Sequence, residues 1–236
     1  MRLLTSFLLM LCAGASAAAQ TRYPAPADMQ TVHIALLKTG PDQTPRSKAD
    51  EDALQAAHIA HLESLGKAGK AIIAGPLVKA GDIRGIVLLR AADAKAAEAL
   101  EADDPAVKAG RLRIEIVSFI TPGNWFSFGP LPEKIDMRTY VFGFLNVAVD
   151  DKTPAADRPK IQDDHLANLW ALRESGALVL AGPVTNSQTH AGVLVMTSDS
   201  VDHAKAILAN DPTVKAGMTT IELYSWFAAD RILKGK

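Results

Sequence analysis

The segment LANDPTVKAG (208–217) repeats a phrase that the chain has already used in EADDPAVKAG (101–110). The shared core, Asp-Pro-x-Val-Lys-Ala-Gly, combines an acid, a helix-breaking proline and a glycine, so an ordinary apolar periodicity does not explain it. Self-similarity at a fixed spacing is the signature of a repeated structural unit. The phrase therefore predicts that this chain of 236 residues contains one unit written twice.

The offset between the two phrases can be applied to the rest of the chain. It aligns identical residues in further pairs: His58 with His165, Gly69 with Gly176, Gly75 with Gly182, Pro76 with Pro183, Gly85 with Gly192, and Gly110 with Gly217. We infer an internal duplication with copies at 28–120 and 138–229. The segment 121–137, rich in Pro, Gly and aromatic residues, joins them and is expected to form an ordered strap.

Each copy shows the same succession of patterns. In the first copy these are a strand at 31–38, a helix at 49–69, strands at 71–75 and 83–90, a helix at 93–102 and a strand at 113–119. Gly-Pro is expected to end the short second strand, and the Pro of the repeated phrase to end the second helix. Asp93, and either Ser198 or Asp199, are the expected caps of the second helices.

The order βαββαβ is that of a ferredoxin-like domain, so the fold class is α+β. Such a unit carries both helices on one face of its sheet and leaves the other apolar face bare. Two units in one chain are expected to bury these faces against each other.

The first 19 residues have the layout of a secretory signal peptide. Arg2 precedes an apolar run of about ten residues, and small residues follow, with cleavage expected after Ala17 or Ala19. The single cysteine, Cys12, lies in this segment, so the mature chain would have neither disulfides nor thiolate sites. We expect a secreted or periplasmic protein without a membrane anchor after cleavage.

The charge pattern excludes several classes of partner. The formal net charge is −1, and acids and bases are scattered along the chain. No basic stripe for nucleic acid and no polybasic segment for anionic lipid is present. The sequence has no phosphate-binding loop and no G-x-S-x-G nucleophile motif. A small molecule is the expected ligand, and self-association is left open.

The motifs also resemble a known family. A helix carrying His-x-x-Leu, a strand ending Ala-Gly-Pro and a helix leading to Asp-Pro-x-Val-x-Ala-Gly are typical of the YCII-related domain, and HLANL (165–169) and NDPTVKAG (210–217) are especially close to it. The resemblance covers about 31–119 and 138–227. It implies membership of the dimeric α/β-barrel superfamily, with the two ferredoxin-like partners fused here into an intramolecular dimer.

The resemblance also implies site residues. The family's active-site pair of His and Asp falls on His58 with Asp104 and on His165 with Asp211. Some relatives are associated with elimination chemistry on hydroxylated, chlorinated aromatics, which implies acid–base work by a lyase, isomerase or hydrolase without a cofactor. The second copy keeps more of the pattern, including Arg158 upstream of its His, so His165 and Asp211 are the first choice.

The residues themselves allow more than one interpretation. A carboxylate on one ring nitrogen orients a His and makes the other nitrogen a usable base, but the same pair can also serve only to clasp two helices together. An Asp before Pro can simply bond the local backbone. The glycines and prolines of Ala-Gly-Pro, at positions 75, 76, 182 and 183, form a strand-end turn or let the backbone approach a ligand. Arg158 is a further candidate ligand-binding residue.

Two further expectations concern the remaining histidines. His58 and His61 can share a helix face, but no carboxylate stands at a matching position and the second copy has Asn168 instead of His61, so no metal site is expected. His33, His190 and His203 have no counterparts in the repeat and are expected at the surface or at sheet edges. The alternatives to an enzyme are a non-catalytic protein that binds a small ligand and a structural scaffold.

Overall fold

The computed structural model describes residues 28–125 and 136–230. The expected signal peptide and most of the expected strap lie outside these residues. The first half consists of β1 (Met29–Thr39), α1 (Lys48–Lys67), β2 (Ala71–Val78), β3 (Ile83–Leu89), α2 (Ala94–Ala102), α3 (Pro105–Lys108) and β4 (Leu112–Pro122). The second consists of β5 (Met137–Val147), α4 (Arg158–Glu174), β6 (Leu178–Pro183), β7 (His190–Met196), α5 (Val201–Leu208), α6 (Pro212–Lys215) and β8 (Thr219–Ala229). The βαββαβ order is thus confirmed in both halves.

Polar caps fix where the helices begin. Ser47 caps α1 by accepting a hydrogen bond from the Asp50 amide, and Asp93 caps α2 as expected. The expected cap of α5, Ser198 or Asp199, was wrong. Ser200 caps this helix, and its hydroxyl accepts a hydrogen bond from the His203 amide. The sequence has three consecutive polar residues at 198–200, and only the backbone geometry shows which of them caps the helix.

The repeated phrase builds more than the end of a helix. Asp104 and Asp211 each cap a further single turn, α3 or α6, in which Pro occupies the first turn. After that turn, Gly110 and Gly217 adopt φ values of 69° and 72°, which favour glycine. The phrase therefore holds the Asp rigidly at a helix start and then turns the chain into the last strand.

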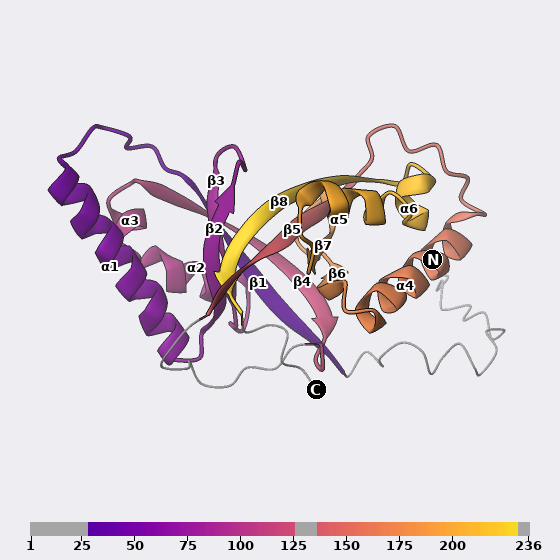
Figure 1. The fold of residues 1–236 in the computed structure, drawn as a ribbon, viewed down its shortest axis with the longest axis horizontal. Helices are drawn as coiled ribbons and strands as arrows, with labels where there is room; N and C mark the ends of the chain where they lie inside the picture. Colours follow the sequence, from indigo (N-terminus) through magenta and orange to yellow (C-terminus); the bar gives the residue numbers. More distant parts are fainter. Residues whose placement is uncertain (1–27, 126–135, 231–236) are drawn as a thin grey trace, which may run out of the picture.

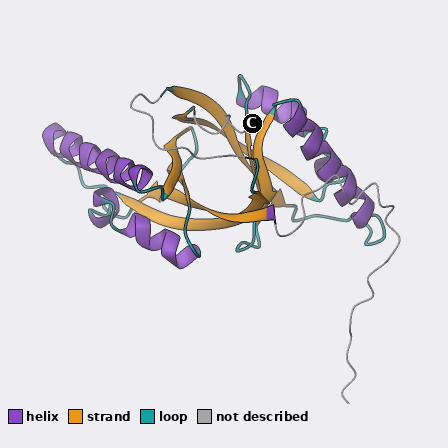
Figure 2. Ribbon diagram, turned by 90° about the horizontal axis from the view of Figure 1, so that it is seen from below, coloured by secondary structure: helices purple, strands orange, loops and turns teal. Residues whose placement is uncertain are grey.

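The eight strands form one antiparallel sheet in the order β4-β1-β3-β2-β8-β5-β7-β6. The halves join where Leu77 of β2 pairs with Trp226 of β8, and the other edges meet where Phe119 of β4 bridges Val184 beyond β6. The sheet is therefore a nearly closed barrel. The helices of the two halves lie outside it on opposite sides, as Figures 1 and 2 show.

Glycine allows the two halves to approach at both junctions. A Cβ atom on Gly75 would lie 2.0 Å from the carbonyl oxygen of Phe227, and one on Gly182 would lie 1.7 Å from that of Ile120. β2 continues through Gly75 and Pro76 to Val78, so the expected end of this strand at Gly-Pro was wrong. The repeated Ala-Gly-Pro is a contact between strands of different halves.

The interior of the barrel is filled by side chains. Tyr140, Phe142 and Trp226 are fully buried there and contact one another edge-on or tilted, at ring-centroid distances of 5.9 and 6.3 Å from the tryptophan. They belong to a core that draws residues from both halves. This confirms the expectation that the bare faces of the two sheets bury each other. Among the described residues, no helix is both long and apolar enough to cross a membrane.

Candidate functional site

The first histidine–aspartate pair joins α1 to the start of α3. His58 Nδ1 lies 2.5 Å from Asp104 Oδ2, and the other oxygen, Oδ1, accepts a hydrogen bond from the Ala106 amide at 2.7 Å. Asp104 is fully buried. Because Nδ1 donates to the carboxylate, Nε2 is the ring nitrogen left for a ligand, and no described residue bonds to it.

The second pair has the same geometry in a more crowded setting. His165 Nδ1 lies 2.9 and 2.7 Å from the two oxygens of Asp211, which also accepts hydrogen bonds from Asn168 Nδ2 at 2.9 Å and from the Thr213 hydroxyl at 2.6 Å. Burial alone raises the pKa of Asp211. The hydrogen bonds and the charge of His165 outweigh burial, so the pKa lies below its ordinary value.

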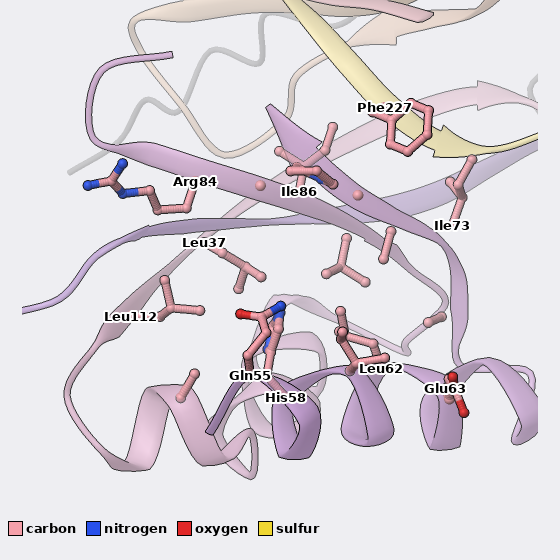
Figure 3. Close-up of a pocket in the computed structure, with 18 of the residues that line it drawn as sticks. Leu37, Gln55, His58, Leu62, Glu63, Ile73, Arg84, Ile86, Leu112 and Phe227 are labelled. Carbon is pink, nitrogen blue, oxygen red and sulfur yellow. The ribbon is translucent and has the colours of Figure 1, made fainter. Parts of the chain in front are cut away.

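A cavity of about 740 Å³ lies between α1 and the sheet of the first half. Gln55, His58 and Leu62 rise from α1 toward this space, and Ile73, Ile86 and Phe227 lie across from them on the strands (Figure 3). Most of the lining is apolar; the charged residues on it are Glu51, Glu63, Arg84 and Arg111. A carboxylate-oriented imidazole beside an apolar hollow can exchange a proton with a bound small molecule.

The first helix of the second half carries larger side chains at two of the positions that line this cavity. Trp170 stands where the first half has Glu63, and Arg173 stands where it has Gly66. Trp170 meets Trp125, which follows β4, edge-on at 5.2 Å, and the Arg173 guanidinium donates to the carbonyl oxygens of Val179 and Trp125 at 2.9 and 2.7 Å. The half that keeps more of the expected pattern therefore carries the bulkier side chains on its first helix, and its histidine does not line the cavity of about 740 Å³.

The other expected ligand-binding residues also fall into two groups, those that line the cavity and those that do not. Gly75 and Pro76 line the cavity beside His58. Gly182 lies against Ile120, and Pro183 is exposed at the end of β6. Arg158 pairs with Asp151 at 2.7 Å and does not line the cavity.

The structure corrects two expectations about other side chains. His33 is buried, 2% exposed, with Nδ1 2.8 Å from the Ser118 hydroxyl, because it points from β1 toward the helix layer rather than to solvent. The sequence pattern offered no carboxylate to His61, yet Glu101 of α2 and Asp104 lie beside it, with potential ligand atoms within 4.8 Å of one another. Glu101 is fully buried, which no local sequence pattern indicates.

The fold defines a fused dimeric α/β barrel, and a cavity of about 740 Å³ in its first half is lined by His58. The YCII-related domain model matches residues 32–120 and again 144–227, and the chain belongs to this family as a tandem duplication. A comparison with curated proteins gives no match.

Solved structures share the fold at low sequence identity. A mutant chlorite dismutase from Candidatus Nitrospira defluvii in complex with cyanide is 9% identical, with a TM-score of 0.57 over 88% of this chain and 94% of that one. A protein from Thermus thermophilus described as heme-binding is 14% identical, with a TM-score of 0.50 over 85% of this chain and 91% of that one. At these identities the likeness concerns the fold alone.

Proposed function

We propose that the protein is a small-molecule enzyme whose active site is the cavity beside His58. His58, oriented by Asp104, exchanges a proton with a bound ligand in an elimination, isomerisation or hydrolysis. The observation that carries this proposal is the cavity of about 740 Å³, which His58 lines and His165 does not. The second half then serves as the scaffold that completes the barrel.

The lining indicates the kind of ligand. Aliphatic side chains and the Phe227 ring favour an apolar or aromatic body of drug-like size. Arg84 and Arg111 are the cations that line the cavity. Arg111 donates a hydrogen bond to Glu51 at 2.5 Å, whereas the one hydrogen bond of the Arg84 guanidinium to a described residue runs from Nε to the Thr39 hydroxyl at 2.9 Å. The rest of the Arg84 guanidinium is therefore suited to a carboxylate or phenolate.

The chemistry at His58 follows from its hydrogen bond. The buried Asp104 carboxylate fixes the tautomer with the proton on Nδ1, and it stabilises the imidazolium that forms when Nε2 takes a proton. A positioned base of this kind contributes roughly 10²–10⁴-fold to a proton transfer. The apolar walls exclude water from the nitrogen while a ligand is bound.

The experiment compares two matched variants. Aromatic acids and phenols are screened for binding by thermal shift and for turnover by product analysis. His58→Gln should retain binding and lose at least about 10²-fold in kcat, whereas His165→Gln should retain turnover and lower the melting temperature. Loss of turnover in His165→Gln but not in His58→Gln would contradict the assignment.

A heme-binding protein is the second candidate function. A histidine that ligates a metal commonly donates its other ring N–H to a carboxylate, and His58 has this arrangement beside a large apolar cavity. Arg84 on the lining could pair with a heme propionate. Titration with hemin, followed by absorbance, distinguishes the candidates, because a ligated heme shifts the Soret band in the wild type and not in His58→Gln.

We further propose that residues 1–19 direct export and are removed. The support is the sequence pattern of Arg2, the apolar run and the small residues before Gln20. Intact mass and N-terminal sequencing of the protein recovered from a bacterial periplasm should show a chain that begins at Ala18 or Gln20. Recovery of the unprocessed chain from the cytoplasm would contradict export.

A further inference from the structure

Three polar atoms of two side chains on α1 and α2 are buried without hydrogen-bond partners in the part of the chain that the structure describes. Among the described residues, both carboxylate oxygens of Glu101 and the Nε2 atom of His61 are shielded from solvent and make no hydrogen bond. Glu101 is 0% exposed. An unpaired buried carboxylate is costly, so its presence calls for a partner that the described part of the chain does not supply.

The unpaired groups converge on one point. His61 extends from α1, Glu101 from α2, and Asp104 from the start of α3, and one ligand atom from each lies within 4.8 Å of the other two. Each Asp104 oxygen has one partner, His58 or the Ala106 amide, and a carboxylate oxygen can accept a second. One imidazole and two carboxylates are thus directed at a shared space.

The electrostatics of this space favour a cation. Glu101 and Asp104 are both fully buried, and a carboxylate oxygen of one lies within 4.8 Å of a carboxylate oxygen of the other. Two carboxylates that repel each other in a desolvated space are stabilised when a metal ion lies between them.

The second half supplies an internal comparison. At the equivalent positions Asn168 replaces His61 and Leu208 replaces Glu101. Asn168 donates to Asp211, and Leu208 is fully buried in the core. The duplicated unit can therefore pack this region with an amide and an aliphatic side chain. The ligand set of the first half is not needed to form the fold.

We propose that His61, Glu101 and Asp104 form a zinc site. Zinc accepts imidazole nitrogen and carboxylate oxygen together in a tetrahedral arrangement, whereas magnesium and calcium prefer oxygen ligands and retain water. Tetrahedral ligands about 2.1 Å from zinc are roughly 3.4 Å apart, so the three groups, which lie within 4.8 Å of one another, must close by at most about 1.4 Å. Rotation about the side-chain bonds of Glu101 provides this movement.

The zinc site shares Asp104 with the His58 pair but lies outside the cavity. His61, Glu101 and Asp104 do not line that cavity, and zinc binding does not require His58 to act on a ligand. Zinc can therefore be tested alone. The full chain, purified with chelator, is titrated with Zn²⁺ by calorimetry, and with Co²⁺ as a spectroscopic substitute whose visible bands report nitrogen and oxygen ligands.

The matched variant is His61→Asn with Glu101→Leu, which copies the residues of the second half. We expect the wild type to bind one zinc ion per chain and to melt at a higher temperature with zinc, and the double variant to lose both effects while it remains folded. His203→Asn, which removes an exposed histidine, should bind zinc as the wild type does.

Three results would overturn the proposal. One is a wild type that shows neither stoichiometric Zn²⁺ binding nor visible Co²⁺ bands. Another is zinc binding that persists unchanged in the double variant. The third is binding that disappears in His203→Asn, which would assign the metal to the surface. The Co²⁺ measurement on the wild type is decisive even if the double variant does not fold.

Discussion

Asp104 and Asp211 occupy equivalent positions, but their carboxylates have different neighbours. Asp211 accepts hydrogen bonds from His165, Asn168 and Thr213, so both of its carboxylate oxygens are occupied by hydrogen-bond donors. Asp104 binds His58 and one backbone amide, and it lies beside the unpaired Glu101. A saturated carboxylate stabilises the fold, whereas Asp104 has capacity left to orient a base or to accept a cation.

The pH dependence of stability should reveal the role of Asp211. Its folded pKa is depressed below the ordinary 3.8, so the unfolded chain takes up this proton first as the pH falls. The resulting stabilisation is fully present above the unfolded pKa and is lost as the pH falls through the folded one. Urea unfolding should therefore show Asp211→Asn less stable than the wild type at pH 6, with the difference shrinking toward pH 3. A difference that grows on acidification would contradict this assignment.

At the residue scale the sequence predicted the two hydrogen-bonded pairs but not what surrounds them. The repeat and the family resemblance both single out His58 and Asp104, although 46 positions separate them. Glu101 belongs to a helix that also carries the exposed Glu98, and nothing local distinguishes the buried acid from the solvated one. His33 was misplaced for the same reason, because burial is set by the elements that pack on a strand.

At the scale of elements, the junction of β2 with β8 depends on the absence of a side chain at Gly75. Gly75→Ala would bring a Cβ within 2.0 Å of a backbone carbonyl, which cannot move without parting the strands. We expect a loss of about 1–3 kcal/mol in the free energy of unfolding, typical of overpacking. Denaturant unfolding measures it, and an unchanged midpoint would show that the strands are not held this closely.

The helix α1 lines a cavity, and at one of the lining positions the equivalent helix α4 carries a much larger side chain. Glu63→Trp places in the first half the residue that the second half has as Trp170. Because Glu63 is exposed and also lines the cavity, the variant should fold normally and weaken ligand binding by roughly tenfold or more, through lost space. Glu98→Trp, on the exposed side of α2, is the control. Equal affinity in both variants would contradict binding in this cavity.

Periodicity and turn residues predicted the main helices and strands, including both Gly-terminated first helices. They did not predict that β2 continues past Gly75 and Pro76. That part of the strand pairs with β8, more than a hundred residues later in the chain. Elements whose ends depend on the other half cannot be delimited from local patterns.

At the scale of the whole molecule, fusion allows two similar units to diverge. In a dimer of identical chains, any residue that fills one cleft fills the other. In the fused chain Trp170 and Arg173 stand in the second half at the positions of Glu63 and Gly66, which line the cavity beside His58 in the first half. One half can thus supply rigidity and the other the site.

The first half, expressed by itself, should form a homodimer in which a second copy takes the place of the second half. In residues 28–122, β2 and β4 would both become edge strands, and Ile34, Ile86 and Phe119, which are buried in the complete barrel, would face water. β4 is the counterpart of β8, so β2 of one copy can pair with β4 of another as it now pairs with β8. Size-exclusion chromatography with light scattering should therefore show a homodimer, whereas the full chain supplies its own partner. A stable, folded monomer of the half-chain would show that the apolar face of one unit needs no cover, and would remove the physical reason for the fusion.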